Sequence, residues 1–327
     1  MSVYKFCLAT AAATFLLLAM PCSPANATTY FEVKKKCPVG GEKFKAYDVG
    51  SSSSWGQRPD GRNFGTLPIW PLIVCPKNGF VIFDEEFTKD ELLKLNEAVS
   101  SAEYQAMIQR DEARHYKAWW LATKIDRPLR QRAGLLMQAS WDSDDLPERK
   151  QRYQREFANL TEQLDLQDAA EGDNFWLSLR GANALRELGE FERAAARIAN
   201  LKSAKNYPMD EEQKKGADWL IEGLSRLIDD KNSFSEPTNL IPRQMAETRC
   251  KAVDLLLGVE LEACQKIATG VPDEEGKGEQ ADEDGIAAAA GAAEVAAEAA
   301  KEAAREAMKA AREAEKAARK AKQKKPS

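Results

Sequence analysis

Apolar side chains recur at intervals of three and four residues through the middle of the chain, which is the spacing of one face of an α-helix. A clear example is the stripe of Tyr153, Phe157, Leu160 and Leu164. Thr88 followed by acidic residues in the first turn is typical of a helix start. Pro128 marks the end of one helix or the start of the next. The pattern predicts helices within residues 88–110, 112–125, 132–144, 148–167, 174–208, 211–230 and from 243 onward.

Residues 174–208 resemble one tetratricopeptide unit, a pair of antiparallel helices with a period of about 34 residues. Gly189 stands at the turn between the two helices, and Ala182 and Ala194 are small enough for their backbones to approach closely. One unit cannot bury its own apolar face, so neighbouring helices must cover it. The predicted fold is therefore mainly α, with a tetratricopeptide-like body of helical hairpins over residues 88–270.

A small β head is predicted before this body, over residues 28–87. Residues 43–49 and 80–86 have the composition of short strands, and the segment between them is rich in glycine, serine and proline. This segment predicts a long loop or irregular β-structure. Its aromatic residues either form a recognition surface or cover a head with little core of its own; they are Trp55, Phe64 and Trp70.

Residues 1–27 have the pattern of a cleaved export signal. Lys5 is followed by an apolar run too short to span a bilayer of about 30 Å, and Ala25 to Ala27 form a small-residue cleavage site before Thr28. An uncleaved anchor and a lipid on Cys22 are the alternatives. The signal predicts a periplasmic or secreted protein.

Two polar segments follow the helical body. Residues 271–284 form an acidic linker, and residues 285–327 are rich in Ala, Glu and Lys and predict a long helix with a basic end. Three roles are open for this tail: it is a solvated spacer, it makes a weak contact with an anionic surface, or it is a helix that docks on a partner. The whole chain carries a formal charge of −5 at pH 7, so no nucleic-acid partner is predicted.

Export also changes the expected role of the cysteines. Two of the six cysteines lie in the predicted signal, and an even number remains for an oxidising compartment, where three pairings are open. Those that remain are Cys37, Cys75, Cys250 and Cys264. On one straight helix, Cys250 and Cys264 would lie about 21 Å apart, whereas a turn at Gly258 would set them side by side.

Cys37 and Cys75 each begin a Cys-Pro-x-x-Gly turn. Together with "HYKAWWLA" and "RAGLLMQASW", these turns make residues 31–229 similar to a bacterial family of unknown function, in which twin CPxCG knuckles form a zinc ribbon ahead of tetratricopeptide-like helices. Gly40 and Asn78 stand where the family has its second cysteines, so a metal site would need unrelated carboxylates. The resemblance implies a Cys37–Cys75 disulfide in place of the metal, or two unpaired buried cysteines.

The sequence predicts no catalytic site and no cofactor. His115 is the only histidine, and phosphate-loop, nucleophile-elbow and zinc-protease motifs are absent from the sequence. A lone histidine in a helix is more often a packed residue than a general base. The acidic clusters 84–87 and 142–145 leave an unrecognised carboxylate-dependent hydrolase as an alternative.

The leading prediction is an exported, non-catalytic interaction or scaffold protein of the cell envelope that binds a protein or peptide in a helical groove. A spacer that acts through its basic tail is a further alternative. The residues expected at the groove are Trp119, Trp120, Trp176 and Trp219, although aromatic residues at helical spacing also build cores.

Overall fold

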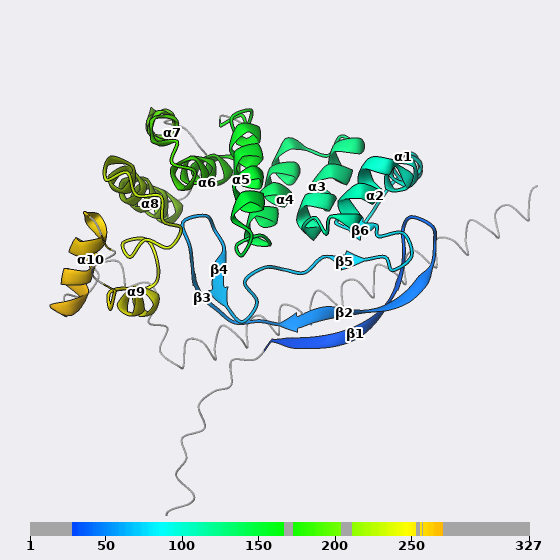
Figure 1. Ribbon diagram of the computed structural model, residues 1–327, viewed down its shortest axis with the longest axis horizontal. Coiled ribbons are helices and arrows are strands. Elements are labelled where there is room, and N and C mark those ends of the chain that lie inside the picture. The colour runs from blue at the N-terminus through cyan, green and yellow to red at the C-terminus, as the bar shows by residue number, and fades with distance from the viewer. Residues whose placement is uncertain (1–27, 167–172, 204–210, 253–255, 257, 271–327) are drawn as a thin grey trace, which may run out of the picture. The chain divides into compact units, whose positions relative to one another are not determined.

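The computed structural model describes residues 28–166, 173–203, 211–252, 256 and 258–270 (Figure 1). The chain divides into two compact units, residues 1–268 and 269–327, and all helices and strands named below lie in the first. The predicted export signal, acidic linker and Ala-rich tail lie outside the described residues. None of the helices in the described part is long and apolar enough to cross a membrane.

The fold is mainly α with a small β head, as predicted. The described residues form three two-stranded antiparallel sheets, β1–β2, β3–β4 and β5–β6, followed by ten helices. The strands are β1 (Thr29–Lys36), β2 (Lys43–Ser51), β3 (Ser54–Gln57), β4 (Asn63–Gly65), β5 (Ile73–Val74) and β6 (Val81–Ile82). The helices are α1 (Lys89–Ser100), α2 (Ala102–Gln109), α3 (Arg114–Lys124), α4 (Leu129–Trp141), α5 (Pro147–Thr161), α6 (Asp173–Glu187), α7 (Phe191–Ser203), α8 (Glu211–Asp229), α9 (Arg243–Arg249) and α10 (Val259–Ala268).

The predicted helix start at Thr88 is confirmed. The Thr88 hydroxyl accepts a hydrogen bond from the Glu91 amide at 3.2 Å, and the Glu91 carboxylate accepts one from the Thr88 amide at 2.7 Å. This reciprocal capping box satisfies two amides at the start of α1. The segment 88–110 contains two helices, because Ser101 has an extended backbone (φ −69°, ψ 149°) that ends α1 and begins α2.

The helical hairpin predicted over residues 174–208 is also confirmed within the described residues. Helices α6 and α7 are joined through Gly189, whose φ of 77° lies in the left-handed region that favours glycine. Ala182 and Ala194 are fully buried in the apolar core that the two helices share. One apolar core continues through α4, α5, α6, α7 and α8, so neighbouring helices cover the hairpin on both sides.

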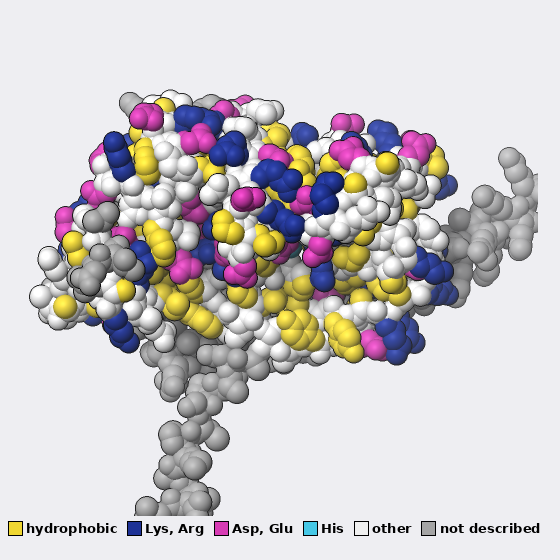
Figure 2. Space-filling view, viewed as in Figure 1, with side chains coloured by type: hydrophobic (Ala, Val, Ile, Leu, Met, Phe, Trp, Pro, Cys, Tyr) yellow, Lys and Arg dark blue, Asp and Glu magenta, His cyan; other side chains and the backbone are white. Residues whose placement is uncertain are grey.

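The β head lies along one side of these helices (Figure 1). Val81 of β6 packs with Ala118 of α3 and Leu135 of α4, which fixes the head to the body. The strand expected over residues 80–86 is confined to Val81–Ile82, and β1 forms although its lysine-rich sequence did not predict it. On the face shown in Figure 2, apolar side chains gather where Figure 1 places β1 and β2, and Tyr30, Phe31 and Tyr47 are exposed.

The two Cys-Pro-x-x-Gly turns face each other and are joined by a Cys37–Cys75 disulfide with a Cα–Cα distance of 5.7 Å. Asn78 occupies the place of a knuckle's second cysteine, and its side-chain amide donates a hydrogen bond to the carbonyl of Val39 in the opposite turn at 2.8 Å. The Glu42 carboxylate and both sulfurs lie within 4.8 Å of one another. Because both sulfurs are in the disulfide, they are not available as thiolate ligands for zinc.

The second disulfide joins Cys250, at the end of α9, to Cys264 of α10, with a Cα–Cα distance of 5.5 Å. The two cysteines are side by side, and Gly258, just before α10, has a φ of 46°, so the predicted turn is confirmed. The Asp230 carboxylate, just after α8, accepts a hydrogen bond from the Val259 amide at 2.8 Å. A Cβ at position 258 would lie 1.9 Å from that carboxylate, so only glycine fits there.

Candidate functional site

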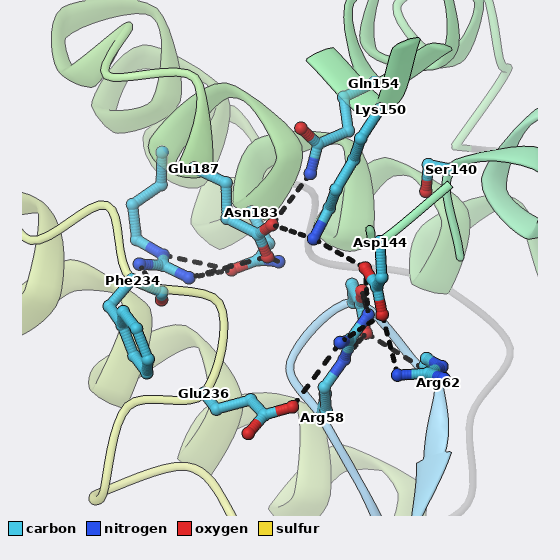
Figure 3. A network of polar contacts seen from close by, with 12 residues as sticks. Arg58, Arg62, Ser140, Asp144, Lys150, Gln154, Asn183, Glu187, Phe234 and Glu236 are labelled. Atoms are coloured by element: carbon cyan, nitrogen blue, oxygen red, sulfur yellow. Dashed lines mark hydrogen bonds and ion pairs between the residues drawn. The ribbon is translucent and has the colours of Figure 1, made fainter. Parts of the chain in front are cut away.

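The β3–β4 hairpin places a buried arginine against the helical body (Figure 3). The Arg58 side chain is 3% exposed, and its guanidinium lies 2.5 Å from Asp60, 2.8 Å from Asp144 and 3.5 Å from Glu236. Burial alone would lower the pKa of Arg58, but Asp60 and Asp144 outweigh it and hold the pKa above its ordinary value. The side chain therefore stays charged and joins the head to two loops of the body.

Asp144 carries the network from the head into α5 and α6. Its carboxylate also pairs with Arg62 at 2.7 Å and with Lys150 at 2.9 Å. Burial opposes the charge of Asp144, but Arg58 and Lys150 hold the pKa of this carboxyl below its ordinary value. Lys150 in turn lies 3.5 Å from Glu187 of α6. Figure 3 shows this chain of contacts running from β3 to α6.

Arg186 of α6 fixes the loop after α8 to the same region. It is fully buried, and its guanidinium donates hydrogen bonds to the carbonyls of Asn232 at 2.8 Å and Phe234 at 2.9 Å. The adjoining cavity of about 430 Å³ is lined by three acidic and three basic side chains. Most of these are paired with one another, including Lys150 with Glu187 and Arg249 with Glu260. We assign this charged cavity a structural role, because a ligand would have to break existing ion pairs.

A second cavity, of about 640 Å³, lies between the head and helices α3, α4 and α6, and we call it the head–body pocket. Trp70, Leu72 and Phe83 line it from the head, and Leu135, Trp176 and Leu177 line it from the helices. Its polar lining consists of His115, Arg130, Gln131, Gln138 and Arg180. None of the described residues that line this pocket is acidic.

His115 of α3 is the buried polar group of the head–body pocket. It is 2% exposed, and its Nδ1 lies 2.7 Å from the carboxylate of Asp142, just after α4. In the neutral imidazole this contact places the proton on Nδ1, so that Nε2 keeps its lone pair. Within the described part of the chain, Nε2 has no hydrogen-bond partner. The sole imidazole is therefore oriented by Asp142 and keeps one polar atom for a ligand.

The structure separates the four tryptophans expected at one groove. Trp176 lines the head–body pocket, whereas Trp119 packs against the apolar cores and Trp219 is 41% exposed on α8. Trp120 is 7% exposed and packs on Tyr104, so it is a core residue and its assignment to the interaction surface is corrected.

The residues that sequence reasoning left out of the site come from the loops. Trp70 was noted only as part of an aromatic loop, and it lines the head–body pocket. The acidic cluster 142–145 supplies Asp142 for His115 and Asp144 for Arg58. Arg58 stands in a Pro-Asp-Gly turn that gives no sequence signal for burial.

No protein-family model, curated protein or solved structure matches this chain. The resemblance to the family with twin zinc-ribbon knuckles stays a prediction from the sequence, and function has to be argued from the head–body pocket itself.

Proposed function

We propose that this chain is an exported, non-catalytic interaction protein of the cell envelope that binds a protein or peptide in the head–body pocket. The observation that carries the proposal is the composition of this pocket, which combines apolar and aromatic residues from both the head and the helices with a few polar groups. Such a lining is typical of ligand sites, and about 640 Å³ lies within their usual range of volumes.

Two separate constraints limit the movement of the head, which supports a preformed site. The Cys37–Cys75 disulfide closes the head on itself, and the contact between Arg58 and Asp144 fixes the β3–β4 hairpin to the body. Trp70 lies on the segment between Arg58 and Cys75 and lines the pocket opposite the helices. A preformed pocket loses less conformational entropy when it binds a partner.

Site-specific crosslinking in the intact envelope tests the proposal. A photoreactive amino acid at Gln138, which lines the head–body pocket, should form a crosslink to a discrete partner. The same amino acid at Gln109, exposed at the end of α2, is the matched control and should not. Adding Trp176→Ala should remove the Gln138 crosslink, whereas Trp219→Ala should leave it. Equal crosslinking from both positions would refute the pocket as the binding site.

The His115–Asp142 pair favours a second candidate, a hydrolase in which the imidazole activates water. Within the described residues, no serine, threonine or cysteine side chain is hydrogen-bonded to His115, so this candidate uses water rather than a protein nucleophile. The two candidates differ in the effect of His115→Gln. A binding protein keeps its Gln138 crosslink or weakens it modestly, whereas a hydrolase loses turnover entirely and accumulates its substrate complex.

A further inference from the structure

The geometry points to a ligand class for the head–body pocket: an apolar group that ends in a carboxylate, supplied by the C-terminus of a peptide with an apolar last residue. This inference rests on the proposed function, because it names the chemistry of the partner at the same site. Three properties of the pocket carry it, namely its apolar lining, the sign of its charges and the position of His115.

The apolar lining matches a hydrophobic or aromatic side chain. Trp70 and Leu72 face the pocket from the head, and Leu135, Trp176 and Leu177 face it from the helices. Aromatic rings supply large contact areas and favour a planar or branched apolar group between them. The volume of about 640 Å³ accommodates the last few residues of a peptide rather than a folded domain.

Among the described residues, the side chains with a full charge that line the pocket are all basic, which distinguishes it from the charged cavity beside Lys150. The whole chain carries 52 acidic and 47 basic side chains, and the charged cavity beside Lys150 has equal numbers of both. The head–body pocket is lined by Arg130 and Arg180 and by no carboxylate among the described residues. A guanidinium has five donors and binds carboxylates through parallel hydrogen bonds, so it can contact a ligand in addition to groups of the protein.

His115 adds a buried polar contact in the same pocket. Its Nδ1 is held by Asp142, and the other charged side chains that line the pocket within the described part of the chain are Arg130 of α4 and Arg180 of α6. The head contributes only uncharged side chains there, including Trp70 and Phe83. A carboxylate near Nε2 is recognised by the protonated imidazole, because both ring nitrogens then donate, Nδ1 to Asp142 and Nε2 to the ligand.

The single histidine makes the proposal directly measurable by NMR. The purified protein is titrated with the peptide Ala-Ala-Phe as the free acid, with its C-terminal amide, and with 3-phenylpropionate, while the imidazole signals of His115 are followed. The free acid should bind about tenfold more tightly than the amide. It should also shift the imidazole signals of His115 further than the amide does.

Each arm decides a separate point. Equal affinity for the free acid and the amide would show that the pocket does not recognise the carboxylate, although the pocket would still be a binding site. Absence of binding by both peptides would overturn the ligand class, while the Gln138 crosslink decides the proposed function independently. If 3-phenylpropionate binds as tightly as the free-acid peptide, a small organic acid replaces the peptide as the source of the carboxylate.

Variants test whether these signals come from the pocket. Trp70→Ala and Trp176→Ala should each weaken binding of the free acid about tenfold or more, since both remove aromatic contact area. Trp70 is 52% exposed, so its replacement should leave the fold intact even if Trp176→Ala does not. Trp219→Ala on α8 removes an exposed tryptophan outside the pocket and should leave binding unchanged. Loss of binding in Trp219→Ala alone would overturn the proposal.

Discussion

The guanidinium of Arg58 lies 2.8 Å from the carboxylate of Asp144, although 86 residues separate them along the chain. This pair is the centre of the contact between the head and the helical body. Arg58 is almost fully buried, and Asp144 also pairs with Arg62 and Lys150. The attachment of the β3–β4 hairpin to the body therefore depends largely on one carboxylate, whereas the packing of Val81 on α3 and α4 holds another part of the head.

Replacement of that carboxylate should destabilise the protein. Asp144→Ala leaves Arg58 with Asp60 as its close partner and leaves Lys150 with Glu187, so we expect the free energy of unfolding to fall by about 2–4 kcal/mol. Asp145→Ala is the matched control, because Asp145 is exposed and should change stability by less than about 0.5 kcal/mol. Urea unfolding measures both, and equal effects of the two substitutions would contradict the role of Asp144.

The parts of the fold that the sequence predicted correctly are set by local interactions. Thr88 and Glu91 are three residues apart, so the capping box that starts α1 is readable from the sequence. The α6–α7 hairpin follows from helical spacing around a glycine at Gly189. Within such short segments, backbone preference and apolar periodicity indicate the same structure.

The head–body contact could not be predicted, because its partners lie far apart in sequence. Arg58 reads as part of a polar turn, and only the folded chain brings Asp144 and Glu236 to it. Strand β1 was missed because three successive lysines give it a polar sequence, whereas its pairing with β2 fixes it in the structure. Trp120 was misassigned because α3 buries residues around most of its circumference, so periodicity does not show which tryptophan is exposed.

Glu156 should make stability depend on pH. Burial raises the pKa of Glu156 above its ordinary value of 4.5, and its Oε2 has no hydrogen-bond partner within the described residues. A raised carboxyl pKa means that ionisation disfavours the folded state. This cost is absent below the unfolded-state pKa, grows as pH rises from the unfolded-state to the folded-state pKa, and is complete above the folded-state pKa.

Glu156→Gln removes this ionisation. The stability of the variant relative to the native protein should therefore be higher near about pH 7 than near about pH 4. Melting temperatures of both proteins across this range measure the difference. Glu222→Gln changes an exposed glutamate in α8 and is the control for a general effect of charge. A difference that is constant with pH would show that ionisation of Glu156 does not cost stability.

Lysine side chains on β1 and β2 repel each other across the ribbon. Lys34 stands directly opposite Lys45, and Lys36 stands opposite Lys43, with all four side chains exposed. Like charges at opposed positions of an antiparallel pair destabilise it. Lys34→Glu should therefore stabilise the protein by about 0.5 kcal/mol at low ionic strength, and salt should reduce the gain. Lys251→Glu is an exposed control outside the ribbon, and an equal gain there would assign the effect to net charge.

The two disulfides should contribute unequally to stability, because they close loops of different length. The sequence separation is 38 residues for Cys37–Cys75 and 14 for Cys250–Cys264. Loop-closure entropy predicts losses of about 4 and about 3 kcal/mol when each pair is replaced by serine. Urea unfolding of the two double variants against the oxidised native protein measures this order, and a larger loss for Cys250–Cys264 would contradict it.

Intact-mass measurements, with thiols alkylated before and after reduction, test whether the native protein carries both disulfides and where it begins. Protein purified from the envelope should begin at Thr28 and show no free thiol until it is reduced.

Reduction also frees the sulfurs of Cys37 and Cys75 beside the Glu42 carboxylate, which together offer three of the four ligands of a closed zinc site. We therefore expect the reduced protein to bind zinc only weakly. Protein that carries stoichiometric zinc and four free thiols when isolated would show that the head is a metal site and not a disulfide-closed one.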